Sequence, residues 1–185
     1  MPLRRLKGFD KSANVYFITT TVMNFENVFS IRREYSLIII DSLQYLFNEH
    51  KSKLFAYVIM PSHVHMILYL PEGQSLVDYM RDFKKYTSVE IRKLAERENR
   101  TDLLKRLERN ARYSKNQRYK HWMDGFDELI ITNVRTLRVK INYIHFNPVK
   151  AGLVERPEDW EFSSARNYLL DDHSLIRVST DWNLD

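Results

Sequence analysis

The chain has 185 residues, of which 44% are hydrophobic and 29% charged; this composition suits one folded domain and excludes wholesale disorder. It contains no cysteine, which excludes disulfides, thiolate catalysis and cysteine-ligated zinc. No apolar stretch approaches membrane-spanning length, and the basic N-terminus is not followed by an apolar run, so we expect a cytoplasmic protein with no membrane partner.

The positive charge of the chain is unevenly distributed. The formal net charge is +5, but residues 81–120 carry 14 Lys and Arg against 6 Asp and Glu, a local charge of +8. Clustered positive charge attracts polyanions, and nucleic acid is the commonest polyanion in a cell. The same composition is typical of a solvated helical face, so charge alone leaves both interpretations open.

The first 70 residues predict a strand, a helix and a pair of strands. Residues 15–22 (VYFITTTV) are rich in β-branched and aromatic side chains, which favours a strand. From about 32 to 50, apolar side chains recur at helical spacing and predict an amphipathic helix. Two apolar runs within 56–70 flank Pro61 and Ser62, which is the pattern of two strands joined by a tight turn.

The next 50 residues predict a second helix and a basic excursion. Ser75 is a candidate N-cap for a helix over 76–94. Residues 96–120 are nearly all charged or polar and predict either a helical excursion or a mobile loop. Aromatic side chains interleave with basic ones here, which suits stacking on unpaired bases or anchoring to the core. These aromatic residues are Tyr113, Tyr119 and Trp122.

The last third of the chain predicts a strand, a helix and an extension. Residues 126–132 favour a strand, and Asn133 can cap a helix that begins at Val134. We predict that this helix ends at Asn147, because a residue that precedes proline disfavours helical geometry. Residues from about 150 to 185 lack linker composition, so we expect a C-terminal extension packed on the same domain.

Two histidines lie on the second strand of the predicted pair. Side chains alternate along a strand, so His63 and His65 share one face. Imidazoles at this spacing suit a small divalent cation whose other ligands come from elsewhere in the fold. The competing interpretation is two partly exposed histidines without a function, and a short motif alone does not exclude it.

The last predicted helix carries a polar stripe beside its apolar one. Thr136, Lys140, Tyr143 and Asn147 follow one another at intervals of four, three and four residues, so their side chains project side by side. A tyrosine one turn from a lysine and one turn from an asparagine is the arrangement expected of a metal-assisted nucleophile. A half-buried packing tyrosine is the alternative, and spacing alone leaves it open.

A phenol needs help to attack at neutral pH, because its reference pKa is about 10. Lys140 and a bound metal ion are candidates for that help. His145 is a weaker candidate, because residues two apart on a helix do not share a face.

Several strings of this sequence together resemble a known family. YVIMPSHVHMILYL, followed by RDFKKYTS and then NYIHFNPVKAGLVERPEDWEFSSARNYL, is similar to the single-tyrosine HUH transposases, and most closely to their REP-associated tyrosine transposase branch. The resemblance covers about residues 15–95 and 119–170. It implies one HUH transposase-like domain over 1–185. The implied fold is α/β (α+β), a ferredoxin-like or RRM-like sandwich with a mainly antiparallel sheet and helices packed on one face.

The same resemblance implies a role for each candidate residue. Tyr143 would be the nucleophile, and His63, His65 and Asn147 would be the ligands of Mg²⁺ or Mn²⁺. The implied substrate is single-stranded DNA with hairpin structure, cut and rejoined through a 5′-phosphotyrosine, by a monomer or a homodimer. The basic side chains expected to contact DNA are Arg81, Lys84, Lys85, Arg92 and Lys140.

The chain departs from the family pattern in three places. Ser62 stands where the family usually has Asn, the segment 124–129 matches loosely, and 96–115 matches no part of the pattern.

Two other functions fit the same residues. One is a catalytically silent RRM-like module that binds RNA or single-stranded DNA. The other is a metal-dependent nuclease that uses water, with Tyr143 only positioning the substrate. A binding module does not need the two histidines, the tyrosine and the asparagine, so their joint presence favours a catalyst.

Overall fold

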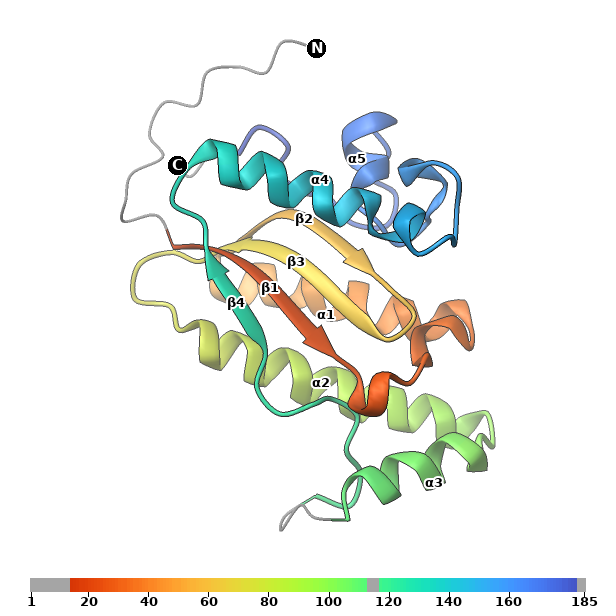
Figure 1. Ribbon diagram of the computed structural model, residues 1–185. Helices are drawn as coiled ribbons and strands as arrows, with labels where there is room; N and C mark the ends of the chain where they lie inside the picture. The colour runs from red at the N-terminus through yellow and green to blue at the C-terminus, as the bar shows by residue number, and fades with distance from the viewer. Residues whose placement is uncertain (1–13, 113–116, 183–185) are drawn as a thin grey trace.

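A four-stranded sheet forms the centre of the molecule. The computed structural model describes residues 14–112 and 117–182, and the aromatic residue Tyr113 lies outside them. The strand order is β2-β3-β1-β4, and every neighbouring pair is antiparallel (Figure 1). The predicted α+β class and antiparallel sheet are therefore confirmed. The strands are β1 (Val15–Thr21), β2 (Lys53–Ile59), β3 (His63–Tyr69) and β4 (Asp127–Ile130).

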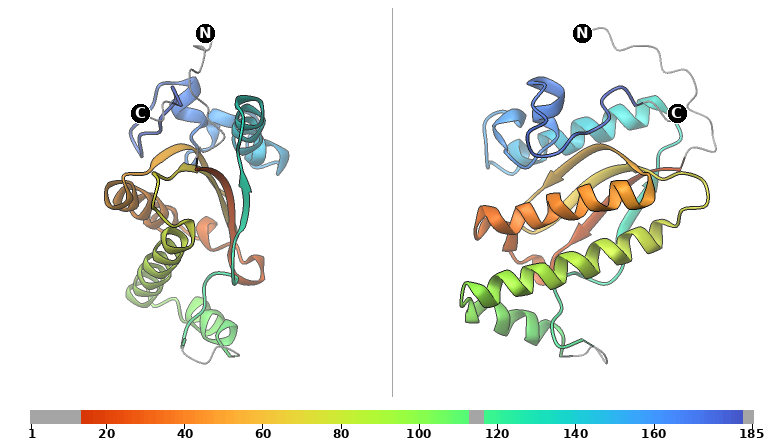
Figure 2. Two further views of the ribbon diagram at one scale, coloured as in Figure 1. Left: turned by 90° about the vertical axis from the view of Figure 1, so that its left-hand side faces the viewer. Right: turned by 180° about the vertical axis from the view of Figure 1, so that it is seen from behind.

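Helices cover both faces of this sheet, which corrects one detail of the prediction. Helices α1 (Arg33–His50) and α2 (Leu76–Arg97) lie side by side on one face (Figure 2), and α4 (Val134–Lys150) packs on the other face against β2 and β3. The reason is that the central strands are apolar on both sides, and an apolar sheet face must be covered. Val64, Met66 and Leu68 face α1 and α2, whereas Val58 and Ile67 contribute to the core beneath α4.

Helices α2 and α4 begin after the predicted capping residues, but α4 does not end before Pro148 as predicted. Ser75 accepts a hydrogen bond from the backbone N–H of Asp78 at 3.2 Å, and Asn133 accepts one from Thr136 at 2.9 Å. The predicted end of α4 at Asn147 is wrong, because the helix continues through Pro148 to Lys150.

Gly152 decides where α4 ends. Its φ is +68°, and the backbone N–H groups of Gly152 and Leu153 bond to the carbonyls of Val149 (2.9 Å) and Pro148 (3.0 Å). These are the paired bonds of a Schellman motif, which satisfies carbonyls that would otherwise lack partners at a helix end. Pro148 removes one intrahelical N–H, but its ring is buried, so packing offsets that loss.

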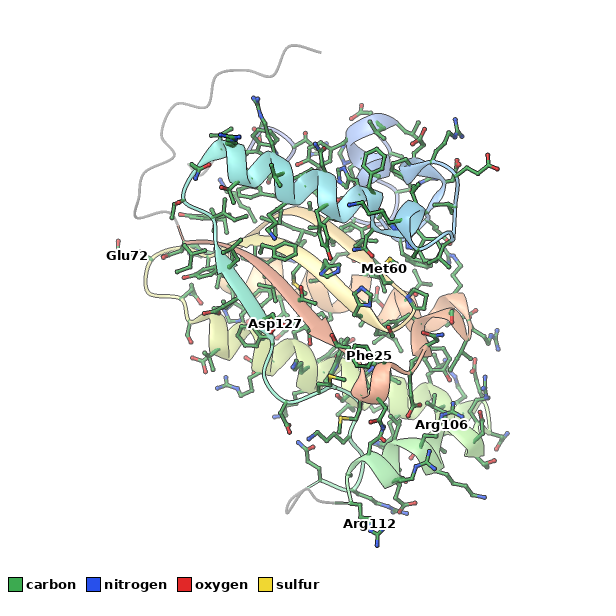
Figure 3. All side chains as sticks on the ribbon, viewed as in Figure 1. Phe25, Met60, Glu72, Arg106, Arg112 and Asp127 are labelled. Atoms are coloured by element: carbon green, nitrogen blue, oxygen red, sulfur yellow. The ribbon has the colours of Figure 1, made fainter. Side chains whose placement is uncertain are left out.

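The described part of the basic excursion is helical. Helix α3 (Thr101–Asn110) follows α2 and buries Leu103 and Leu107. Its polar side reaches the turn that contains Phe25, and Figure 3 labels Arg106 and Phe25 in these two elements. There Arg106 forms an ion pair with Glu26 at 2.8 Å. The excursion is thus docked on the domain along this helix.

Residues after α4 pack along the outer edge of β2. Ser164 accepts a hydrogen bond from the backbone N–H of Tyr57 at 3.0 Å and donates one to the Tyr57 carbonyl at 3.1 Å. The hydroxyl of Tyr168, on the short helix α5 (Ala165–Leu169), donates to the carbonyl of Phe55 at 2.8 Å. These contacts cover a sheet edge that would otherwise be open to pairing with another chain. None of the helices in the described parts is long and apolar enough to span a bilayer.

Buried His121 gives a pH-dependent term in stability. It is 2% exposed, and neither ring nitrogen has a hydrogen-bond partner among the described residues. Burial lowers the pKa of His121 to about 3. Below pH 6.5 the imidazole of His121 binds a proton in the unfolded chain but stays neutral in the folded chain. We therefore expect His121 alone to lower the free energy of unfolding by about 1.4 kcal/mol per pH unit between about pH 6 and pH 3.

Replacing His121 with leucine tests this expectation. Urea unfolding at pH 7.5 and pH 5 should show a smaller loss of stability in His121→Leu than in the wild type, by about 2 kcal/mol. His50→Gln, which changes a partly exposed imidazole at the end of α1, serves as the control and should keep the wild-type loss. An equal loss of stability between pH 7.5 and pH 5 in His121→Leu and the wild type would contradict the pH dependence attributed to His121.

Candidate active site

Two imidazoles lie side by side on β3, on the face that α4 covers. The ring centroids of His63 and His65 are 4.8 Å apart with an interplanar angle of 75°. β3 is flanked by β2 on one side and β1 on the other, so the strand that carries them is held along both edges. The shared face predicted from strand alternation is what the structure shows.

One nitrogen of each imidazole is hydrogen-bonded to a hydroxyl group. Nδ1 of His65 is 2.9 Å from the Thr19 hydroxyl, which lies directly opposite it on β1, and Nδ1 of His63 is 3.3 Å from the Ser62 hydroxyl. With a proton on Nδ1 donated to the hydroxyl, Nε2 of each ring presents a lone pair.

Both imidazoles are held in the neutral form. Burial lowers the pKa of His63. Burial, with smaller contributions from His63 and Lys140, lowers the pKa of His65 to about 3. Neutral imidazole is the form that binds metal ions, so the pair is suited to that role at neutral pH.

Tyr143 of α4 lies over this pair. Its ring centroid is 5.3 Å from that of His65 and 5.8 Å from that of Phe17 on β1, and both contacts are edge-on. The side chain is 38% exposed, so the phenol is open to a ligand. Apolar side chains of α4 (Leu137, Ile141 and Ile144) pack on the sheet, and this packing places the polar stripe of the helix beside the histidines.

Two ammonium groups flank the Tyr143 ring. Nζ of Lys140 is 5.6 Å from the ring centroid, and Nζ of Lys150 is 5.7 Å from it. Sequence reasoning identified Lys140 and missed Lys150, because it ended the helix at Asn147. Lys150 lies seven residues, about two turns, after Tyr143 on the continued helix. Two positive charges therefore lie near the Tyr143 ring.

Asn147 and His145 take opposite sides of α4. Asn147 lies one turn beyond Tyr143 and is partly exposed. His145 is buried, and its Nε2 is hydrogen-bonded to the Ser164 hydroxyl at 2.9 Å. The structure therefore keeps His145 away from the phenol, as the helical spacing indicates.

Comparison with known proteins identifies the family of this chain. The family model described as "Transposase IS200 like" matches residues 16–147, a segment that contains both histidines, Tyr143 and Asn147. The chain belongs to the IS200-like transposase family.

Its relatives in this family include REP-associated tyrosine transposases. The protein of that name from Escherichia coli K12 is 31% identical over 109 residues, which are 59% of this chain and 52% of the relative. A similarly described protein from Haemophilus influenzae Rd is 32% identical over 114 residues, which are 59% of this chain and 56% of the relative. The chain thus spans about half the length of the curated relatives it matches.

One solved structure shares the fold of nearly the whole chain. It is described as a REP-associated tyrosine transposase bound to a REP hairpin. The TM-score is 0.63 at 23% identity, and the match covers 98% of this chain and 92% of the other. At this identity the similarity supports the α+β fold.

The donor groups of this candidate site fit a divalent ion with open coordination positions. Among residues 14–112 and 117–182, no three His, Asp or Glu side chains converge as a metal cluster. Two imidazole nitrogens can hold an ion whose other ligands are oxygen atoms from an amide, water or a phosphate. Asn147 is the amide that the sequence stripe places one turn from Tyr143.

The predicted DNA contacts fall into two groups on opposite faces of the sheet. Lys140 lies beside Tyr143, whereas Arg81, Lys84, Lys85 and Arg92 lie on α2. The ammonium of Lys84 is already engaged, because it donates to the carbonyls of Met123 (3.0 Å) and Gly125. Lys84 therefore ties α2 to the segment before β4.

Proposed function

We propose that this chain is a DNA strand transferase of the transposase type. It binds single-stranded DNA with a hairpin and cuts and rejoins it through a 5′-phosphotyrosine, assisted by Mg²⁺ or Mn²⁺. The observation that carries the proposal is the position of Tyr143. Its ring centroid is 5.3 Å from that of His65, which lies side by side with His63. The related structure that holds a REP hairpin supports the choice of substrate.

Tyr143 is the nucleophile in this proposal. Its hydroxyl oxygen forms a bond to phosphorus while the bond from phosphorus to the 3′-oxygen breaks, the phenol proton is lost, and the departing 3′-oxygen takes up a proton. The products are a 5′-phosphotyrosine and a free 3′-OH. One ester replaces another, so attack by a second 3′-OH reverses the step and joins DNA without a nucleotide cofactor.

The remaining residues position the reacting groups and balance their charge. His63, His65 and Asn147 would hold the ion, and a bound divalent ion supplies positive charge to a non-bridging phosphate oxygen. Lys140 and Lys150 place two positive charges near the Tyr143 ring, where they would favour an attacking phenolate. Phe17 contacts Tyr143 edge-on and stacks on His65 with an interplanar angle of 19°, so it keeps the two rings in place.

A denaturing gel distinguishes this function from its alternatives. Hairpin oligonucleotides from the DNA that flanks the gene are labelled at the 3′ or the 5′ end and incubated with Mn²⁺. A strand transferase moves the 3′ label into a slow covalent protein–DNA band and leaves the 5′ label on a shorter free strand. A water-using nuclease cuts without that band, and a binding module leaves the DNA intact, so either result overturns the proposal.

Thr19 is expected to orient His65 for metal binding. In Thr19→Val the Nδ1–H of His65 loses its partner, and loss of such an outer contact reduces metal affinity by about 10- to 100-fold. We therefore expect Mn²⁺ affinity, followed by the electron paramagnetic resonance of free Mn²⁺, to fall within that range. Thr19→Ser retains the hydroxyl and is the matched control, and equal affinities in all three proteins would contradict the role.

A further inference from the structure

A cavity lies between α2 and the segment 117–125. Its volume is about 520 Å³, within the range of ligand pockets. Five of its lining side chains are cationic and one, Asp124, is acidic. Aromatic side chains line it beside these charges. The lining includes Arg81, Lys85, Arg92, Tyr119 and Trp122.

The cavity has fixed walls. The ammonium of Lys84 donates to two carbonyls of the facing segment, those of Met123 and Gly125. The indole N–H of Trp122 donates to the Thr87 hydroxyl of α2 at 2.9 Å. Hydrogen bonds therefore join the two sides of the cavity and fix the distance between them.

An aromatic ring lies among the cations of this cavity. The guanidinium carbon of Arg92 is 5.8 Å from the Tyr119 ring centroid, and that of Arg118, which is outside the cavity lining, is 5.2 Å from it. Tyr119 is partly exposed, so one ligand can contact both the ring and the charges. A nucleotide combines a flat base with an anionic phosphate, and proteins bind single strands by stacking bases on aromatic rings while cations hold the backbone.

The cations differ in how free they are to receive a phosphate. Arg81 is paired with Asp78 and Asp82, and Arg92 with Glu96 at 2.6 Å. In the described parts of the chain, Lys85 forms no ion pair and is exposed. Burial lowers the pKa of Lys84 to about 8, and an anion in the cavity would offset that shift.

The cavity is separate from the candidate active site. Helix α2 covers the sheet face opposite the one on which α4 and Tyr143 lie (Figure 2). A nucleotide bound beside α2 therefore belongs to a different part of the DNA from the phosphodiester at Tyr143.

We propose that this cavity holds one unpaired nucleotide of the bound hairpin DNA, outside the cleavage point. Its base lies against Tyr119, and its phosphate is received by Lys85, which is exposed and forms no ion pair among the described residues. The inference rests on the proposed function for the identity of the ligand. It adds a recognition site that reads the unpaired part of the hairpin, through stacking and charge.

The test uses hairpins that carry 2-aminopurine at one unpaired position at a time. With the wild type, one position outside the cleavage point should change in fluorescence on binding, and that change should be lost in Tyr119→Ala. The Kd for that hairpin should rise about 5- to 150-fold, the range for loss of one base–aromatic stack. Tyr119→Phe should restore both signals, and Tyr45→Ala, at an exposed tyrosine on α1, should leave them unchanged.

A second variant covers the case in which Tyr119→Ala unfolds. Lys85→Gln changes an exposed side chain and should raise the Kd of the same hairpin, with little effect on a hairpin that lacks the identified nucleotide. Unchanged Kd values and unchanged fluorescence in Tyr119→Ala and Lys85→Gln would overturn the inference.

The covalent band separates this inference from the proposed function. If the wild type forms no band but Tyr119→Ala weakens binding at one nucleotide, the cavity site stands and strand transfer fails. If the wild type forms the band and the cavity variants bind as the wild type does, strand transfer stands and the cavity site fails.

Discussion

Tyr143→Phe is expected to abolish the covalent protein–DNA band and to leave hairpin affinity unchanged. Phenylalanine lacks the oxygen that would bond to phosphorus, and loss of a nucleophile lowers rates by more than about 10³-fold. The ring is retained, so its edge-on contacts with His65 and Phe17 persist. A gel with the 3′-labelled hairpin measures the band, and fluorescence anisotropy of the same DNA measures the affinity.

Controls decide whether the effect belongs to this tyrosine. Tyr45→Phe removes an exposed phenol from α1, far from the imidazole pair in the fold, and should leave the band at wild-type intensity. If the band persists in Tyr143→Phe, the nucleophile is another residue, and the proposed function loses its basis. Loss of the band together with loss of DNA binding would point instead to a positioning role, as in the water-using nuclease.

Local signals predicted most of the elements, because each depends on nearby residues. Strand alternation placed His63 and His65 on one face, and the capping residues Ser75 and Asn133 marked the starts of α2 and α4. These features need no knowledge of what packs against them. The antiparallel sheet also followed, through the family resemblance.

The end of α4 shows two local rules in conflict. The proline rule ends the helix at Asn147, whereas the glycine at position 152 predicts a later end. The helix follows the glycine rule, because the ring of Pro148 is buried and the Schellman hydrogen bonds after it stabilise the later end. This choice has a functional consequence, because it adds the turn that carries Lys150 to the side of Tyr143.

Residues that act through a partner strand were beyond sequence reasoning. Thr19 contacts His65 only because β1 and β3 pair in the register that sets these two residues opposite each other. Nothing in the string VYFITTTV distinguishes Thr19 from Thr20 or Thr21 without that register. The separation of Lys140 from the basic residues of α2 likewise depends on which face each helix covers.

The largest expected effect on metal binding is that of His65→Phe. The ring of His65 stacks on Phe17 at a centroid distance of 5.6 Å and is 5% exposed, so an aromatic replacement keeps the packing and removes both nitrogens. Loss of an outer contact already costs about 10- to 100-fold in metal affinity. Loss of a ligand itself should therefore reduce Mn²⁺ affinity by more than about 100-fold.

The covalent band should disappear in the same variant, whereas hairpin binding measured in EDTA should match the wild type. His50→Phe changes an imidazole at the end of α1, on the opposite face of the sheet, and should retain wild-type Mn²⁺ affinity. If His65→Phe binds Mn²⁺ as the wild type does and still forms the band, the ion does not bind at the imidazole pair. In that case Tyr143 would act without a metal ion at the neighbouring pair His63 and His65, and the proposed role of that pair would be wrong.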